Sequence, residues 1–450
     1  MKYLRFDPLK CNNEILVDYH KEKLNFKNHE KSISLTLVLI TVFTSCILAQ
    51  NAQVTETISK DSINLNEKIV PDIDRKEQVV LYTGQDLVDD DFKGSWPMFG
   101  TDMRMKVGGY VQANVLYDFS GTLDPTQFLM STIPVEGQPE YGGRSYMNFY
   151  TKDSRFNIDV RRTMGKVPLK LFLEGDFFSS SSQLRLRHAY MVAGDFIVGQ
   201  TWTTLSIMES LPFMIDFAAG DALFGGRTAQ IRYQKKLSDQ LRFAVAIENI
   251  STLGIENSNN IPGNAMYQLP VIPIRFDYSW QTGLLAVGAS AAMLSWNGGA
   301  NGPNPNAFQT NIVVAGRQYL GKVTFVTWNV SYGQASGENI MAFAGSNANA
   351  VLTANGELDR IPSFALVVGA KHSWSKTFSS NFSYAYGWLE VPASRDPFAL
   401  QDGGIGHVNV LYSPQSYFTT GIEFMWGAQR TTNDAFGRAS RIQMMAKFSF

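Results

Sequence analysis

From Trp96 to the end of the chain, apolar and polar side chains alternate with a period of two. In the first such stretch, from Met105 to Tyr117, the odd positions are apolar or small and most even positions are polar. Successive side chains of a β-strand point to opposite faces, so this pattern predicts strands with one apolar and one polar face. The apolar face would be the core of a soluble sandwich, or the lipid-facing side of a membrane barrel.

The alternating pattern recurs about sixteen times, and the roughly 350 residues after Trp96 allow about 22 for each strand with its share of connection. This length suits strands of about 10 residues joined by turns and loops. The sequence therefore predicts an all-β fold, a transmembrane antiparallel β-barrel of about 16 strands. Lipid-facing sets are expected at Phe156/Ile158/Val160, Leu169/Leu171/Leu173, Leu241/Phe243/Val245/Ile247, Ile272/Ile274/Phe276/Tyr278/Trp280, Val326/Trp328/Val330/Tyr332, Phe382/Tyr384/Tyr386/Trp388 and Phe418/Ile422/Phe424/Trp426.

The connections between these runs alternate between long and short. A barrel with its N-terminus in the periplasm has long extracellular loops and tight periplasmic turns in alternation, which a soluble sandwich has no reason to keep. The order therefore favours an outer-membrane barrel. Long connections are expected at 120–145, 177–183, 204–226, 249–271, 297–309, 333–362, 390–406 and 428–439, and short ones near Gly165, Gly194, Ser238, Gly283, Gly321, Lys376 and Pro414.

Composition and the end of the chain agree with an outer-membrane location. Charged residues make up 18% of the chain, against about 25% in ordinary soluble domains. The net charge of -1 argues against nucleic acid as a partner, because a polyanion requires a basic surface. The final amphipathic strand ends in Phe450, which resembles the signal read by the barrel assembly machinery. Outer-membrane lipid is the expected surrounding.

The N-terminal region contains one long apolar run, Leu35 to Ala49, which follows Lys31. At about fifteen residues it is short for a transmembrane helix and is typical of the apolar part of a secretory signal. Phe43 to Cys46 faintly resembles a lipidation motif, and Met1 to Glu30 is long enough to be an upstream extension. We expect a signal peptide with an atypically long n-region at 1–50, a periplasmic tail at 51–97 and the barrel at 98–450.

Charged residues on the polar faces are expected to line the lumen. Arg185 and Arg187 share one face of a strand, and basic residues modestly outnumber acidic ones on these faces. A guanidinium keeps its charge and presents a planar fork suited to carboxylate or phosphate. These arginines either form an anion-selective ladder or pair with neighbouring acids and stiffen the wall. The expected pore-lining residues are Arg161, Glu174, Arg185, Arg187, Arg232, Arg242 and Arg275.

The third long connection, 204–226, is unusually apolar for a loop. We expect it to fold inward and narrow the lumen, so that its acidic side chains face the arginine-bearing wall across a constriction. A transverse field of this kind would orient dipolar or anionic solutes. The alternative is a short surface helix over the barrel mouth. The expected constriction residues are Glu209, Asp216, Asp221 and Arg227.

Several segments resemble the DcaP-like outer-membrane porins. They are Gly94–Phe119 (GSWPMFGTDMRMKVGGYVQANVLYDF), Leu171–Phe178 (LFLEGDFF), Leu184–Met191 (LRLRHAYM), Val198–Leu205 (VGQTWTTL) and Leu211–Asp221 (LPFMIDFAAGD). The similarity is specific to about Tyr233; beyond it, only the strand pattern and Phe450 carry the match.

This resemblance implies a trimeric, sixteen-stranded porin that passes small anionic solutes such as dicarboxylates. It also implies that Glu174, Arg185, Arg187 and Arg232 are lumen residues. Longer members carry an N-terminal coiled coil, whereas the tail of this chain lacks clear heptads.

Other functions are less well supported by the sequence. Beyond the signal the histidines are His188, His372 and His407, which fall on separate strands and show no metal-ligand spacing. Cys11 and Cys46 both precede the barrel. We therefore expect no catalytic residue, no metal and no cofactor. A gated transporter would need about 22 strands and a plug, for which the chain is too short. A surface adhesin, or an outer-membrane enzyme with a plugged lumen, remains the alternative.

Overall fold

The computed structural model describes residues 92, 94–98, 102–162, 167–179, 181–218, 220–250, 253–392 and 395–450. All of them belong to the compact unit Val70–Phe450. The expected signal peptide at 1–50 and nearly all of the expected tail at 51–97 lie outside the described residues.

Long strands dominate the described part of the chain. They are β2 (Met103–Asp118), β3 (Tyr146–Tyr150), β4 (Arg155–Arg162), β5 (Leu169–Asp176), β6 (Arg185–Ala193), β7 (Phe196–Trp202), β8 (Arg227–Lys236), β9 (Leu241–Glu248), β11 (Asn264–Trp280), β12 (Gly283–Asn297), β13 (Asn306–Tyr319), β14 (Thr324–Gln334), β17 (Pro362–Ser373), β18 (Phe378–Leu389), β19 (Leu400–Gln415), β20 (Phe418–Thr431) and β21 (Phe436–Ser449).

Short elements lie outside this series. They are strands β1 (Trp96–Pro97), β10 (Ile255–Glu256), β15 (Ala350–Leu352) and β16 (Leu358–Arg360), and the 3-10 helices η2 (Met130–Thr132), η3 (Met208–Ser210), η4 (Gly337–Asn339) and η5 (Met341–Phe343). Among the described residues, no helix is long and apolar enough to cross a membrane.

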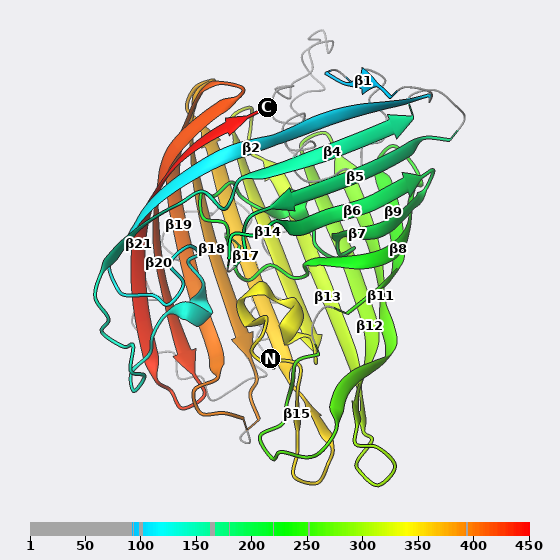
Figure 1. Cartoon of the computed structure of the whole chain (residues 1–450), viewed down its shortest axis with the longest axis vertical. Coiled ribbons are helices and arrows are strands. Elements are labelled where there is room, and N and C mark those ends of the chain that lie inside the picture. The colour runs from blue at the N-terminus through cyan, green and yellow to red at the C-terminus, as the bar shows by residue number, and fades with distance from the viewer. Residues whose placement is uncertain are drawn as a thin grey trace, which may run out of the picture. The chain divides into compact units, whose positions relative to one another are not determined.

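Each long strand pairs antiparallel with its neighbours in chain order, and β2 pairs with β21 to close the sheet (Figure 1). Strands β3 and β4 pair with successive halves of β2 and act as one wall strand with a bend at 151–154. The described strands therefore form a closed barrel of sixteen, as the sequence predicts. Closure leaves no strand edge whose backbone groups would go unpaired in lipid.

The two faces of the wall differ as the alternation predicts. On β2 the side chains of Val111 and Tyr117 are 57% and 41% exposed, whereas Gln112 and Asn114, on the other face, are 7% and 0% exposed. Aromatic pairs such as Phe196–Tyr233, Tyr278–Trp280, Phe378–Tyr412 and Tyr417–Phe448 gather at the strand ends next to short turns. This is the position of an interfacial aromatic girdle.

The alternation of long and short connections holds for seven of the eight expected long ones within the described residues. The expectation of a long connection at 428–439 is wrong, because β20 and β21 continue through this range and a four-residue turn at 432–435 joins them. Strand β11 likewise begins at Asn264, inside the expected loop 249–271. Polar and small residues at these strand ends hid the continued pairing in the sequence.

A buried ion pair lies where the barrel closes. Arg441 of β21 places Nε 3.0 Å from Oδ2 of Asp118 on β2, and both side chains are fully buried. The same guanidinium donates to Oγ1 of Thr122 and to the carbonyl of Asp124 in the first connection (119–145). This pair therefore ties the last strand, the first strand and the first long connection together.

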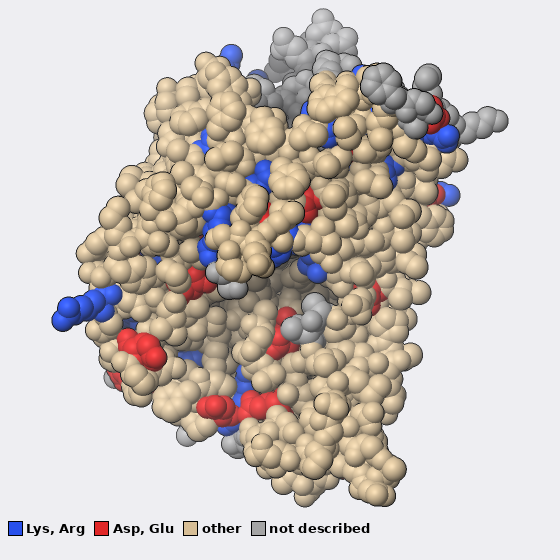
Figure 2. Space-filling view, in the orientation of Figure 1, with Lys and Arg blue, Asp and Glu red and all other residues tan. Residues whose placement is uncertain are grey.

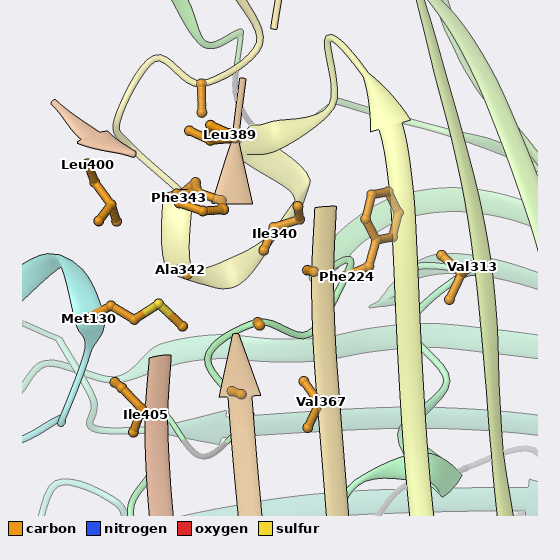
Figure 3. Packing of buried hydrophobic residues seen from close by; sticks show 14 of the residues in the cluster. Met130, Phe224, Val313, Ile340, Ala342, Phe343, Val367, Leu389, Leu400 and Ile405 are labelled. Atoms are coloured by element: carbon orange, nitrogen blue, oxygen red, sulfur yellow. The ribbon is translucent and has the colours of Figure 1, made fainter. Parts of the chain in front are cut away.

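Three long connections pack against one another and against residues of the wall. The first connection contributes Met130, the third connection (203–226) contributes Phe224, and the sixth connection (335–361) contributes Ile340 and Phe343 (Figure 3). They meet inward-facing wall residues such as Val367 of β17. The apolar contacts on the inner side of the wall therefore form a core between connections rather than an open apolar lumen.

Removal of the Arg441 guanidinium should destabilise the barrel. Arg441→Met leaves the Asp118 carboxylate buried without its cation, which costs about 3–5 kcal/mol. The variant should lose its heat-modifiable folded band at a lower temperature and unfold at a lower urea concentration. The matched control is Arg438→Met, which removes an exposed arginine from the same strand. Equal stability of the two variants would contradict a structural role for the buried pair.

Candidate functional site: a cavity beside an arginine-rich inner wall

The third connection (203–226) begins with firm attachments to the inner wall. The carboxylate of Glu248 on β9 accepts hydrogen bonds from the backbone N–H and hydroxyl of Thr204, both at 2.6 Å. Arg275 of β11 donates to the carbonyl of Thr204 and lies 3.5 Å from Glu209. Burial opposes ionisation of Glu209, but Arg275, together with a backbone hydrogen bond and the charges of Arg242 and Arg317, holds the pKa of Glu209 below its usual value. Glu209 is therefore an anchor on the arginine-bearing side.

The middle of the third connection is attached to the distant strands β14, β19 and β20. The amide of Asn329 donates to the hydroxyl of Ser210, and the amide of Asn409 donates to the carbonyl of Phe213. Glu423 accepts the backbone N–H groups of Ile215 and Asp216 at 2.7 and 3.0 Å. Each wall residue in these bonds is on the polar face of its strand.

The returning part of the third connection is tied to two other connections. Asp216 accepts the backbone N–H of Phe128, and Asp221 accepts that of Met130. Phe224 forms a β-bridge with Ile340 of the sixth connection (335–361). Backbone N–H groups bonded to carboxylates therefore join the first and third connections, and a β-bridge joins the third and sixth, in addition to the apolar core.

An aromatic stack joins the tip of the third connection to the wall. The rings of Phe217 and Phe178 are 4.1 Å apart and nearly parallel. Three cations face this stack, with Lys152 and Arg185 over Phe178 and Arg187 over Phe217. This contact ties the tip of the third connection to the side of the wall where β5 ends.

Two arginines on β6 share two carboxylates on β5. Arg185 binds Asp176 through two hydrogen bonds of 2.9 and 2.8 Å. Arg187 lies 2.9 Å from Glu174 and 2.7 Å from Asp176. Arg155 of β4 lies 3.5 Å from Glu174. The sequence prediction placed Arg185, Arg187 and Glu174 together on the inner wall, and the structure has them in one hydrogen-bonded group.

A β-bulge orients this group. The pairing of β5 with β6 shifts between Glu174, which faces His188, and Gly175, which faces Leu186. Arg187 is the extra residue, so both it and His188 are buried on the inner side. Bulges commonly redirect a side chain in this way. The sequence analysis assumed a strict alternation of inward and outward residues, which could not predict this register shift.

The other expected wall residues lie at separate places. Arg161 pairs with Asp159 at 2.8 Å. Arg232 donates to the carbonyl of Trp202, 2.5 Å away. Arg227 places its guanidinium 4.8 Å from the centre of the Trp202 ring. Arg242 faces Asp277 across the β9–β11 register. These residues extend the basic inner wall beyond the group on β5 and β6.

A cavity of about 470 Å³ lies between the third connection and the inner wall. Its basic lining consists of Arg155, Arg187, Arg227 and Lys447, and its apolar lining includes much of the stretch 211–217. Figure 2 shows a hollow with Lys and Arg along its upper rim and Asp and Glu beneath. Asp216 lines the cavity, whereas the structure places Asp221 fully buried against Met130.

Four acidic side chains also line this cavity. They are Asp153, Asp216, Glu248 and Glu338, all at most 4% exposed. Each accepts hydrogen bonds from neutral groups; Glu338, for example, accepts the backbone N–H groups of Gly345 and Ala348.

Sequence reasoning missed several lining residues. Tyr110, Asp153 and Lys447 line the cavity. Arg317 lies on the inner face of β13, a strand in which the sequence pattern did not show which alternate residues face inward. Lys447 follows the alternation of the final strand, so the sequence pattern could have identified it as an inward-facing residue. Asp153 lies in the bend between β3 and β4, which interrupts the alternation. The described residues contain no group of three or more His, Cys, Asp or Glu side chains placed to hold a metal ion.

The closed barrel, its apolar outer face and its partly filled polar interior define an outer-membrane channel of the porin class. The chain belongs to the DcaP outer membrane protein family, whose model matches residues 51–450. Its location is therefore the outer membrane. A comparison with curated proteins finds no match.

Solved structures with the same fold include two outer-membrane channels. The crystal structure of the outer membrane channel DcaP of Acinetobacter baumannii is 18% identical, with a TM-score of 0.67 over 77% of this chain and 97% of that chain. An anion-selective porin from Comamonas acidovorans is 12% identical, with a TM-score of 0.54 over 77% of this chain and 100% of that chain. At these identities the similarity concerns the fold.

Loss of the Phe178–Phe217 stack should loosen the tip of the third connection. An aromatic pair contributes about 0.5–1.5 kcal/mol beyond its buried area, so Phe217→Ala should raise single-channel conductance and its fluctuation. Planar-bilayer recording measures both quantities. Phe149→Ala, at an outward position of β3 that is 63% exposed, is the control and should behave as the wild type. A conductance identical to wild type in Phe217→Ala would argue against the tip as a constricting element.

Proposed function

We propose that the protein is a diffusion porin that favours small hydrophilic anions, carboxylate-bearing ones in particular. The observation that carries this proposal is the difference between the basic and acidic residues around the cavity. Arg155 and Arg227 are partly exposed there, while the acidic side chains that line it are buried and hydrogen-bonded to neutral groups. A solute in the cavity would therefore meet guanidinium groups first.

The balance of charge within the arginine group supports an anion preference. Arg155, Arg185 and Arg187 share the two carboxylates Glu174 and Asp176 in the ion pairs described above, and Arg227, which lines the same cavity as Arg155 and Arg187, is a fourth cation. The pairs hold the guanidiniums in place, and the cationic excess remains. A fixed guanidinium fork binds a carboxylate through two parallel hydrogen bonds. Ion pairing and anion attraction are therefore compatible roles of the same wall.

We propose that the third connection is the constriction element. Its attachments to β9 and β11 at one end and to β19 and β20 further on support a path across the inside of the barrel. Its lining of the cavity is largely apolar, from Leu211 to Phe217. A passing anion would have cations on one side and an apolar surface on the other, where field lines concentrate.

A homotrimer is the proposed assembly. The proposal follows from the DcaP-like resemblance rather than from a contact seen in the chain. Light scattering of the detergent-solubilised protein, corrected for bound detergent, would give three times the chain mass. A monomeric mass in mild detergent would contradict it.

Ion selectivity under a salt gradient tests the anion preference. The wild type should give discrete open steps with an anion-leaning reversal potential. Arg155→Gln with Arg227→Gln should lower the anion-to-cation permeability ratio by up to about thirtyfold per charge, since one charge at about 4 Å in water favours an anion by about 1 kcal/mol and disfavours a cation by the same amount. Arg187 is unsuitable for this test because it is buried between Glu174 and Asp176.

Arg438→Gln supplies the matched control, since it removes one arginine from the outward face of β21. Its selectivity should equal that of the wild type. An unchanged ratio in the Arg155/Arg227 variant would contradict the assignment of these side chains to the selectivity region. A folded barrel with no conductance would instead favour a plugged lumen, and with it an adhesin or an outer-membrane enzyme.

A further inference from the structure

Four titratable side chains are buried where the third connection meets β19 and β20. We call Asp216, Asp221, His407 and Glu423 the tip cluster; Asp216 is 2% exposed and the others are fully buried. Nε2 of His407 lies 3.7 Å from Oδ2 of Asp216. Among the described residues, this histidine is the single basic group within 4 Å of the three carboxyls. The cluster therefore holds more potential negative charge than positive charge.

The carboxyls of the tip cluster hold the connections in place. Glu423 binds two backbone N–H groups of the third connection and the amide of Asn409. Asp216 and Asp221 each bind one backbone N–H of the first connection, and the bond from Met130 to Oδ2 of Asp221 is 2.8 Å long. Asp221 is thus a direct link between the first and third connections.

The surroundings of the cluster do not neutralise Asp221. From β3 and the bend after it, Tyr150 and Asp153 are near enough to interact electrostatically with Asp216. Arg441 of β21 is engaged with Asp118. The first connection supplies only backbone N–H groups to the cluster carboxyls. His407 partly offsets the charge of Asp221, but its 3.7 Å contact is with Asp216, so protonation is the way to remove the charge of Asp221 itself.

Two features of Asp221 agree with a protonated carboxyl. Its Oδ1 is buried without a hydrogen-bond partner among the described residues, and a buried unpaired oxygen costs more on an ionised group than on a neutral one. Burial, together with the nearby Asp216, raises the pKa of Asp221 to about 7, although the N–H of Met130 and the charge of His407 act in the opposite direction. The side chain therefore changes charge near neutral pH.

We propose that Asp221 is a proton-sensitive latch that holds the first and third connections together and regulates the pore they surround. When Asp221 is protonated, the latch is closed and the tip of the third connection stays docked. When it ionises, repulsion from Asp216 favours release of the tip. The effect on permeation rests on the proposed function, whereas the latch itself does not.

The direction of the pH effect follows from linkage. The docked arrangement binds the Asp221 proton more tightly than the released one, whose carboxyl has the ordinary pKa of about 4. The latch contributes its full stability below about pH 4, weakens as the pH rises, and loses the contribution once the pH passes about 7. Each unit of difference in pKa changes the docking equilibrium about tenfold.

Hydrogen exchange tests the latch without any measurement of current. The readout is the exchange of the peptide that contains the amides of Phe128 and Met130, in wild type and in Asp221→Asn at the same pH. Asparagine keeps an oxygen for Met130 and cannot ionise. The exchange rates of the two proteins should differ by no more than a few-fold at about pH 4.5, and the wild type should exchange at least about tenfold faster at about pH 8. Comparison at equal pH removes the intrinsic pH dependence of exchange.

Asp239→Asn, in the exposed turn between β8 and β9, is the matched control and should follow the wild type at both pH values. Equal exchange of wild type and Asp221→Asn at both pH values would overturn the proposal. So would faster exchange in Asp221→Asn at both values, which would make Asp221 a simple hydrogen-bond acceptor. If single-channel fluctuation rises with pH in wild type but not in Asp221→Asn, the latch also affects conductance through the pore. An absence of anion selectivity in these recordings would contradict the proposed role of the arginines and would not bear on the latch.

Discussion

The structure depends on the requirement that every backbone N–H and C=O in lipid finds a partner. A closed antiparallel sheet meets this requirement, because each strand has neighbours on both sides. The pairing of β2 with β21 supplies the last of these contacts. Closure also gives each strand one side toward lipid and one side toward the interior. Because the apolar face turns to lipid, the polar face becomes the inner surface. The buried Arg441–Asp118 pair lies at this closing contact and connects it to the first loop inside the barrel.

An inner surface of this size cannot be filled by strand side chains alone. The alternation puts residues as different as Val313, Arg275 and Glu423 on the same inner face. The apolar ones pack against apolar residues of the first, third and sixth connections, while the acidic ones bind their backbone N–H groups. The connections therefore depend on the wall for hydrogen bonds as well as for apolar contacts. This division leaves space next to the arginines of β4, β6 and β8.

The strands were predictable because they depend on a local pattern. Lipid on one side and polar groups on the other impose a period of two, which is readable at β2 or β20 from the sequence alone. The exceptions have physical causes. The bulge at Arg187 turns two consecutive residues inward, and packing against the third connection places apolar Val313 and Ala315 on the inner face of β13. The sequence did not show which alternate residues of that stretch face inward, because its inward residues are as apolar as its outward ones.

The path of the third connection was harder to predict because it depends on contacts distant in the sequence. The pattern indicated an apolar, inward-folding segment, but not which of its acids would face the arginines. Glu209 lies beside Arg275, whereas Asp221 is buried against the first connection, about 90 residues earlier in the chain. A carboxyl in a loop can face a solute or accept hydrogen bonds from backbone N–H groups, and only the tertiary arrangement determines which it does. In this barrel the acids bind mainly backbone N–H groups, and Arg155, Arg227 and Lys447 remain as partly exposed cations in the lining of the cavity.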